Sequence, residues 1–216
     1  MAMRISTQIP INNIRINRYI NVDKFKILIT EKYIWFNKLN NFSDEHEGRA
    51  LVNWQNNSVC ITNRWRESFV VNCWNKDLDE NFALWNIYLG KENNGLCLVS
   101  NKDNFKKSLI NENDVEGYIV NYVQYGKYLE SIGSLPMAIT KYEWYSYENE
   151  FRFLKYVGTD LSDNGIKVKV DPKVLIDKII LSPNIENKVE KEIINLCVEN
   201  DIDPSIIEHS VIRDRL

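Results

Sequence analysis

The chain has 216 residues, of which 44% are hydrophobic and 26% charged, so it is long enough to bury a sizeable core in one large domain. This composition excludes a disordered tail, a coiled coil and a collagen-like fibre. With 27 Lys and Arg against 30 Asp and Glu, the net charge of −3 shows no global basic excess of the kind that indicates binding to nucleic acid or anionic lipid.

Strands and helices are predicted in chain order from side-chain spacing. A strand over residues 14–20 precedes a helix that Asn21 can cap, because Val22, Phe25 and Ile29 recur at helical spacing. Helices are expected over residues 80–89 and 185–199 and a closing strand over 206–212, with further strands at 33–36, 58–62, 69–74, 95–99, 118–123, 148–156, 166–170 and 176–181. Short strands without strict β-α-β alternation favour one α+β domain over residues 1–216, with a mainly antiparallel, twisted sheet and a few packed helices.

Cysteine spacing and hydropathy predict the compartment. The four cysteines, Cys60, Cys73, Cys97 and Cys197, form no C-x-x-C pair, and three of them lie in apolar runs. We therefore expect free thiols rather than disulfides or a zinc site. The N-terminus has no continuous apolar stretch, and no run approaches the ~20 apolar residues of a membrane-spanning helix. The prediction is a cytoplasmic protein that does not enter a membrane.

The segment around Glu148, Glu150 and Arg152 carries the side chains best suited to catalysis or ligand binding. If it is a strand, these three side chains share one face, because side chains alternate along a strand. The face is then either the solvated side of an antiparallel sheet or the floor of a cleft that binds a polar ligand. Two carboxylates so close would perturb each other's ionisation, and Arg152 could keep one of them charged.

Other candidate residues lie in two further segments. Asp44, His46 and Glu47 could supply a carboxylate or a proton carrier, or they form a capped turn. Trp85 is expected in the core, yet Trp85 and Tyr88 together could also sandwich a flat ring such as nicotinamide or a base. Neither a glycine-rich phosphate loop nor a G-x-S-x-G or HExxH motif is present.

Three segments in this order resemble the bacterial family known as domain of unknown function 2971. They are Phe42-Ser43-Asp44-Glu45-His46-Glu47, then Trp85 and Tyr88 followed by Gly95, and then Tyr145-Ser146-Tyr147-Glu148-Asn149-Glu150-Phe151-Arg152. The resemblance spans about residues 14–212. Ser43 and Glu45 depart from the family pattern, which has Asn and Pro at these places.

A second resemblance, to ADP-ribosyltransferase-like domains, concerns mechanism. Such domains begin with a strand that carries Arg or His, continue into a helix, and have Glu-x-Glu or a lone Glu on a later strand. Arg18-Tyr19, the helix after Asn21, and Glu148-x-Glu150 follow that order. The resemblance implies an ADP-ribosyltransferase-like fold and NAD as a substrate, with no metal.

The same resemblance implies roles for individual residues. Glu150 would be catalytic, and Glu148 would orient the acceptor or the ribose. The cofactor-binding set would be Arg18, Tyr19, Trp85, Tyr88 and Arg152, in which Arg18 meets the phosphates and the aromatic rings line the nicotinamide site. Asp44, His46 and Glu47 are further site candidates.

The leading hypothesis is therefore an NAD-consuming ADP-ribosyltransferase-like enzyme that acts as a toxin or antiviral-defence effector. Its acceptor would be a protein or a nucleic acid, and a neutralising or regulatory protein would restrain it. One alternative is a non-catalytic ligand- or protein-binding module of a defence system, in which the acidic–arginine strand is structural. Another is a metal-dependent nuclease that uses Asp44, Glu148 and Glu150, although Arg152 stands where such nucleases have lysine.

Overall fold

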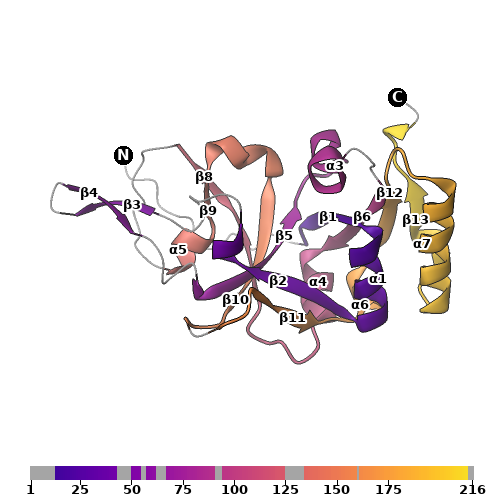
Figure 1. Cartoon of the computed structure of the whole chain (residues 1–216), viewed down its shortest axis with the longest axis horizontal. Helices are drawn as coiled ribbons and strands as arrows, with labels where there is room; N and C mark the ends of the chain where they lie inside the picture. Colours follow the sequence, from indigo (N-terminus) through magenta and orange to yellow (C-terminus); the bar gives the residue numbers. More distant parts are fainter. Residues whose placement is uncertain are drawn as a thin grey trace. The chain divides into compact units, whose positions relative to one another are not determined.

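The computed structural model describes residues 13–42, 50–54, 57–61, 67–90, 94–124, 134–159 and 161–213 (Figure 1). The described chain divides into two compact units, each assembled from separate stretches of sequence. The first unit takes its described residues from Trp35–Cys73 and Asp114–Lys167, and the second from Asn13–Ile34, Trp74–Asn113 and Val168–Leu216. A single domain over the whole chain stays a prediction.

The strands of the second unit are mainly antiparallel. Strand β1 (Arg15–Asn21) pairs with β6 (Gly95–Asn101) along its whole length. Strand β6 also pairs antiparallel with β12 (Lys178–Leu181), and β12 pairs in parallel with the short β13 (Ile207–His209). In this order, β6 and β12 lie between β1 at one end and β13 at the other.

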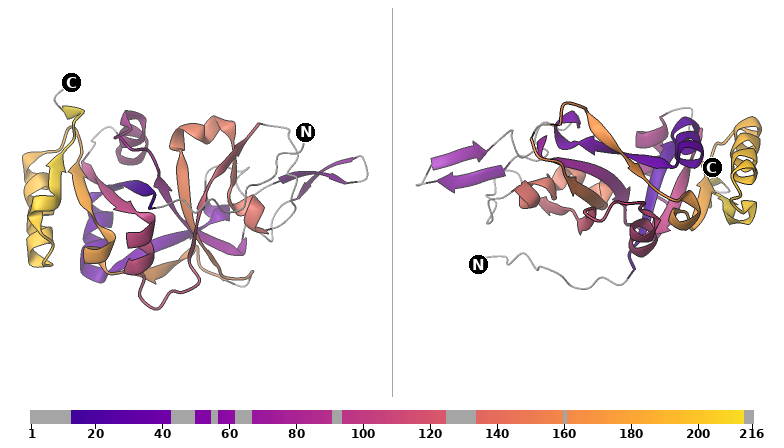
Figure 2. Two further views of the ribbon diagram at one scale, coloured as in Figure 1. Left: turned by 180° about the vertical axis from the view of Figure 1, so that it is seen from behind. Right: turned by 90° about the horizontal axis from the view of Figure 1, so that it is seen from below.

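Five helices of the second unit are α1 (Val22–Glu31), α3 (Phe82–Leu89), α4 (Lys102–Ser108), α6 (Pro172–Leu175) and α7 (Asn187–Glu199). Helix α1 begins as predicted, because the Asn21 side chain accepts a hydrogen bond from the Lys24 amide at 3.0 Å. Helix α7 lies beside β13, where Glu190 and His209 approach to 3.3 Å (Figure 2). A hydrophobic cluster of this unit consists of Tyr19, Leu84, Trp85, Cys97, Val99 and Ile180.

In the first unit, β2 (Tyr33–Lys38) pairs antiparallel with β5 (Phe69–Asn75), and β10 (Glu150–Tyr156) pairs antiparallel with β7 (Glu116–Ile119). Strand β10 also pairs with β5, and β11 (Gly165–Lys169) pairs with β2. Two small sheets join β3 (Ala50–Trp54) to β4 (Asn57–Ile61) and β8 (Asn121–Val123) to β9 (Thr140–Tyr142). The short helices are η1 (Leu39–Asn41), α5 (Ser134–Ala138) and η2 (Glu143–Glu148).

The units confirm the predicted mixture of mainly antiparallel strands with a few helices, with two corrections. The strand predicted over residues 118–123 is two strands in different sheets, because the Val120 amide bonds to the Glu150 carbonyl while the Asn121 amide bonds to the Ile139 carbonyl. The strand predicted from residue 148 begins at Glu150. Helix α4 was not predicted.

The structure tests the sequence predictions about the cysteines and about membrane-spanning helices. Cys97 and Cys197 are buried thiols outside any disulfide, as predicted, whereas the Cys73 thiol, also not in a disulfide, is half-buried. The side chain of Cys60 lies outside the described residues. In the described parts of the chain, no helix combines the length and apolar character needed to cross a membrane.

Candidate active site

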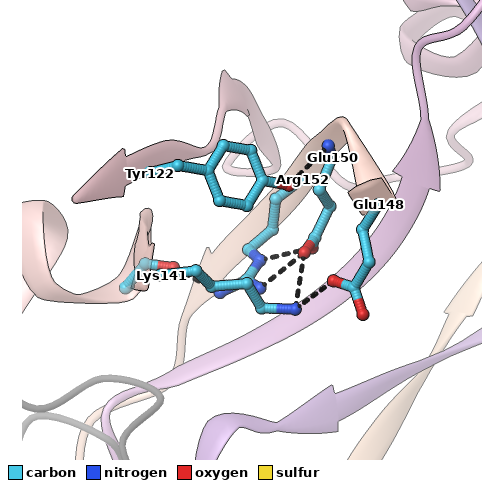
Figure 3. A network of polar contacts seen from close by, with 6 residues as sticks. Tyr122, Lys141, Glu148, Glu150 and Arg152 are labelled. Atoms are coloured by element: carbon cyan, nitrogen blue, oxygen red, sulfur yellow. Dashed lines mark hydrogen bonds and ion pairs between the residues drawn. The ribbon is translucent and has the colours of Figure 1, made fainter. Parts of the chain in front are cut away.

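Four charged side chains of the first unit meet where three of its elements end or begin (Figure 3). Lys141 lies on β9, Glu148 ends η2, and both Glu150 and Arg152 lie on β10. We call these four residues the ion cluster. Tyr122, on β8, borders it.

The backbone turns at Asn149, between the two glutamates. Asn149 has a φ of 40°, in the left-handed region, and its amide closes η2 with a 3.1 Å hydrogen bond to the Ser146 carbonyl. Asparagine is among the few residues that adopt this conformation readily. Because Glu148 is helical, the prediction that it shares a strand face with Glu150 and Arg152 is wrong. The latter two do lie on one face of β10.

The Glu150–Arg152 pair is the buried part of the ion cluster. Arg152 Nε lies 2.7 Å from Glu150 Oε1, and Arg152 Nη2 lies 3.0 Å from Oε2. Arg152 Nη1 donates to the Ala138 carbonyl at 2.6 Å. Glu150 is 3% exposed and Arg152 0% exposed, so this side of β10 is not the solvated face of a sheet.

Lys141 joins the two glutamates. Its Nζ lies 2.6 Å from Glu148 Oε2 and 2.9 Å from Glu150 Oε2, and the ammonium sits 5.6 Å from the centre of the Tyr145 ring. Sequence reasoning missed Lys141, since it falls in a segment where no element was predicted. The sequence held only an indirect signal for a second cation: if both carboxylates are buried, they need more positive charge than Arg152 alone supplies.

The surroundings of Glu150 keep it ionised. Burial alone would raise the pKa of its carboxyl, but the Arg152 and Lys141 cations and the Cys73 thiol outweigh burial and lower the pKa to about 2. The Glu150 amide donates to the Tyr122 hydroxyl at 2.9 Å. Burial raises the pKa of Tyr122, so its phenol stays neutral beside these charges.

The predicted ring-binding aromatics lie in the second unit, and two of the three are core residues. Tyr19 is 4% exposed, its hydroxyl accepts from the Asn81 amide at 2.9 Å, and its ring packs edge-on against Trp85 with centroids 4.7 Å apart. Trp85 is fully buried and donates from Nε1 to Glu80 at 3.0 Å, which confirms the core prediction. Tyr88 stacks 6.4 Å from Tyr19 and is 51% exposed, so among the three it alone offers ring surface to a ligand.

Arg18 lies on β1 of the second unit. Its guanidinium carbon is 5.8 Å from the centre of the Trp74 ring, a cation–π contact. Nearby Lys24 is a second cation. Partial burial, and next the Arg18 charge, lower the pKa of Lys24. Arg18 and the ion cluster belong to different units.

Asp44, His46 and Glu47 lie outside the described residues. Within the described ranges, no three His, Cys, Asp or Glu side chains gather as a metal site would require. The nuclease alternative and the roles of these three residues stay predictions.

Neither a protein-family model nor a curated protein matches this sequence. Among solved structures, DarT of Thermus sp. 2.9 in complex with carba-NAD+ aligns with 93% of this chain and 96% of its own, at 13% identity and a TM-score of 0.42. The complex of the same protein with ADP-ribosylated ssDNA aligns with 93% of this chain and 95% of its own, at 14% identity and a TM-score of 0.44. At these values the likeness assigns neither a fold nor an activity to the present chain.

The ion cluster presents its two carboxylates differently. The Glu148 side chain is 16% exposed and the Glu150 side chain 4%. Both oxygens of Glu150 are held by Arg152, whereas Lys141 contacts one oxygen of Glu148. The arrangement can therefore offer one oriented carboxylate, that of Glu148, to a ligand that carries hydroxyl groups or develops positive charge.

Proposed function

We propose that the chain is an NAD-consuming, ADP-ribosyltransferase-like enzyme with the corresponding fold, in which Glu148 faces the substrate and Glu150 anchors the ion cluster. The observation that carries this proposal is the partial exposure of Glu148 next to the buried Glu150–Arg152 pair. It exchanges the roles that the resemblance implied for the two glutamates. A side chain enclosed as tightly as Glu150 is poorly placed to meet a substrate directly.

The proposed reaction, cleavage of NAD, explains why the site would need a carboxylate. Breaking the bond between nicotinamide and ribose passes through a state like an oxocarbenium ion, and a carboxylate that binds the ribose hydroxyl stabilises the positive charge. This stabilisation is strongest when the carboxylate is held in place before the reaction. The 2.6 Å contact with Lys141 holds Glu148 in this way.

In the second unit, taken by itself, a pair of cations and an exposed aromatic ring are groups that suit a phosphate and a flat ring. Arg18 lies on β1 and Lys24 in the first turn of α1, and the charge of Arg18 reaches Lys24. A pyrophosphate is a natural ligand for such a pair of cations. The exposed ring of Tyr88 could stack on a flat heterocycle. The proposal also includes a protein or nucleic-acid acceptor, a toxin or defence role and a restraining protein partner.

Nicotinamide release from NAD by the purified chain tests the activity, together with transfer of labelled ADP-ribose to protein and to nucleic acid. E148Q should lower the turnover by roughly 10²-fold or more. The matched control is E143Q, which changes an exposed glutamate in the same helix η2 and should leave turnover unchanged. The proposal is wrong if the wild-type chain releases no nicotinamide and labels no acceptor, or if E148Q is as active as wild type.

The second candidate function is a non-catalytic ligand- or protein-binding module. It is favoured by the complete burial of Arg152 and by the two carboxylate contacts that occupy its guanidinium, because such a pair is also what a purely structural anchor looks like. This candidate predicts that no product forms and that a folded E148Q chain retains any protein partner in a pull-down. Nicotinamide release by wild type that E148Q abolishes would exclude it.

A further inference from the structure

We propose that Lys141 is a positioning residue, whose buried ammonium orients the Glu148 carboxylate while Glu150 keeps that ammonium paired when Glu148 turns toward a ligand. This assignment rests on the proposed function, since it concerns the same carboxylate. It adds a residue that none of the sequence patterns indicated.

Within the ion cluster, the two cations are divided between the two carboxylates. Arg152 contacts both oxygens of Glu150, at 2.7 and 3.0 Å, so the Glu150 charge already has a bidentate cation. Lys141 is closer to Glu148, at 2.6 Å, than to Glu150, at 2.9 Å. The ammonium is therefore the counter-charge of Glu148 in the first place, with Glu150 as its second acceptor.

The strand that carries Lys141 and the burial of its side chain fix the position of the ammonium. It lies on β9, where it pairs in register with Tyr122 of the parallel strand β8, and the Tyr122 hydroxyl accepts the Glu150 amide at 2.9 Å. The Lys141 side chain is 6% exposed. Two independent links thus connect the β8–β9 sheet to the start of β10, and the Lys141 ammonium has little freedom to move.

A bound ligand would compete with the Lys141 ammonium for the Glu148 carboxylate. A buried ammonium without a partner is costly, so a lysine paired with one carboxylate would resist the departure of that carboxylate. Here the 2.9 Å contact to Glu150 remains when the Glu148 side chain rotates. Glu148 can exchange the ammonium for a substrate hydroxyl without leaving a bare cation in the interior.

The activity test compares K141M, K141R and the control K155M in the full chain. Lys155 lies on β10 and pairs with Asp114 at 3.1 Å, so K155M removes a lysine from the same unit but not from the ion cluster. We expect K141M to lower kcat for NAD by roughly 10²-fold with little change in KM, because a displaced carboxylate loses transition-state stabilisation rather than binding. K141R, which keeps the charge, should recover part of kcat, and K155M should match wild type.

A second measurement needs no activity. Urea unfolding midpoints of wild type, K141M, E148Q and the double variant form a cycle, in which direct pairing predicts that the double loss is smaller than the sum of the two single losses. If wild type does not turn over NAD, the proposed function fails and this cycle alone decides whether Lys141 holds Glu148. Additive losses in the cycle, or a wild-type kcat in K141M beside an active wild type, overturn the assignment. If K141M does not fold, K141Q replaces it with the same expected results.

Discussion

Arg152 holds both carboxylate oxygens of Glu150 although the two residues are only two positions apart on β10. Residues two positions apart on a strand point to the same face of the sheet, which places the two charged side chains side by side. Here the buried surroundings and the Ala138 carbonyl direct the guanidinium back along the strand. The pair gives the ion cluster a rigid base, and Glu148 is its exposed part.

Replacing Glu150 should therefore affect stability more than replacing Glu148. E150Q leaves Arg152 and Lys141 buried with one carboxylate fewer, and we expect a loss of about 3–5 kcal/mol in the free energy of unfolding. E148Q should cost less, because the Lys141 ammonium keeps its 2.9 Å contact with Glu150 and Glu148 itself is partly exposed. Urea denaturation of both variants measures the difference, and equal losses would contradict this view of Glu150 as the anchor.

The ion cluster should also lose stability in acid. The folded-state pKa of Glu150, about 2, lies below its ordinary value of 4.5, so the unfolded chain takes up this proton first as the pH falls. The contribution of Glu150 is thus complete above about pH 4.5 and declines between there and pH 2. Unfolding midpoints measured across this window should fall less steeply for E150Q than for wild type. Parallel curves would show that Glu150 does not carry the dependence.

The aromatic residues of the second unit should differ in how much they contribute to stability, according to how deeply each is buried. Trp85 is fully enclosed, and W85A is expected to cost about 3–5 kcal/mol of unfolding free energy, because it empties a large core site. Y88A changes a half-exposed ring and should stay within about 0.5 kcal/mol of wild type. If Tyr88 stacks on NAD, calorimetry should show weaker NAD binding by Y88A at unchanged stability. Unchanged binding would remove Tyr88 from the ring site.

Local signals in the sequence predicted much of this structure. Asn21 caps α1 as expected, and Trp85 is buried in the core, as expected for a large aromatic side chain. The reason is that caps and periodic apolar faces depend on neighbours within a few residues. Lys141 could not be found in this way, because its role arises from pairing between β8 and β9 and from contact with two other elements.

The turn at Asn149 was hidden for a different reason. The alternation of Glu148, Glu150 and Arg152 fits a strand, and nothing in that pattern separates a continuous strand from a helix end followed by a strand. The signal was the asparagine itself, which tolerates a positive φ. One residue in the left-handed region changes which way Glu148 leaves the backbone.

Asn149 can be tested directly. N149G should be close to neutral, because glycine adopts the left-handed conformation freely, whereas N149A should cost about 1 kcal/mol. Thermal unfolding compares the two variants. If N149A also lowers NAD turnover while N149G does not, the conformation of this turn sets the position of Glu148. Equal stability of the two variants would mean that the turn is not strained by a Cβ atom.

Within the described residues, the ion cluster sets two cations against two anions in a place that water barely reaches. Loss of Glu150 or Arg152 alone would leave the interior with an unbalanced charge, so we expect single substitutions at these two positions to be selected against. The two residues should instead be exchanged together for neutral residues more readily than either alone. Covariation between these two columns is the footprint that such a history would leave among related sequences.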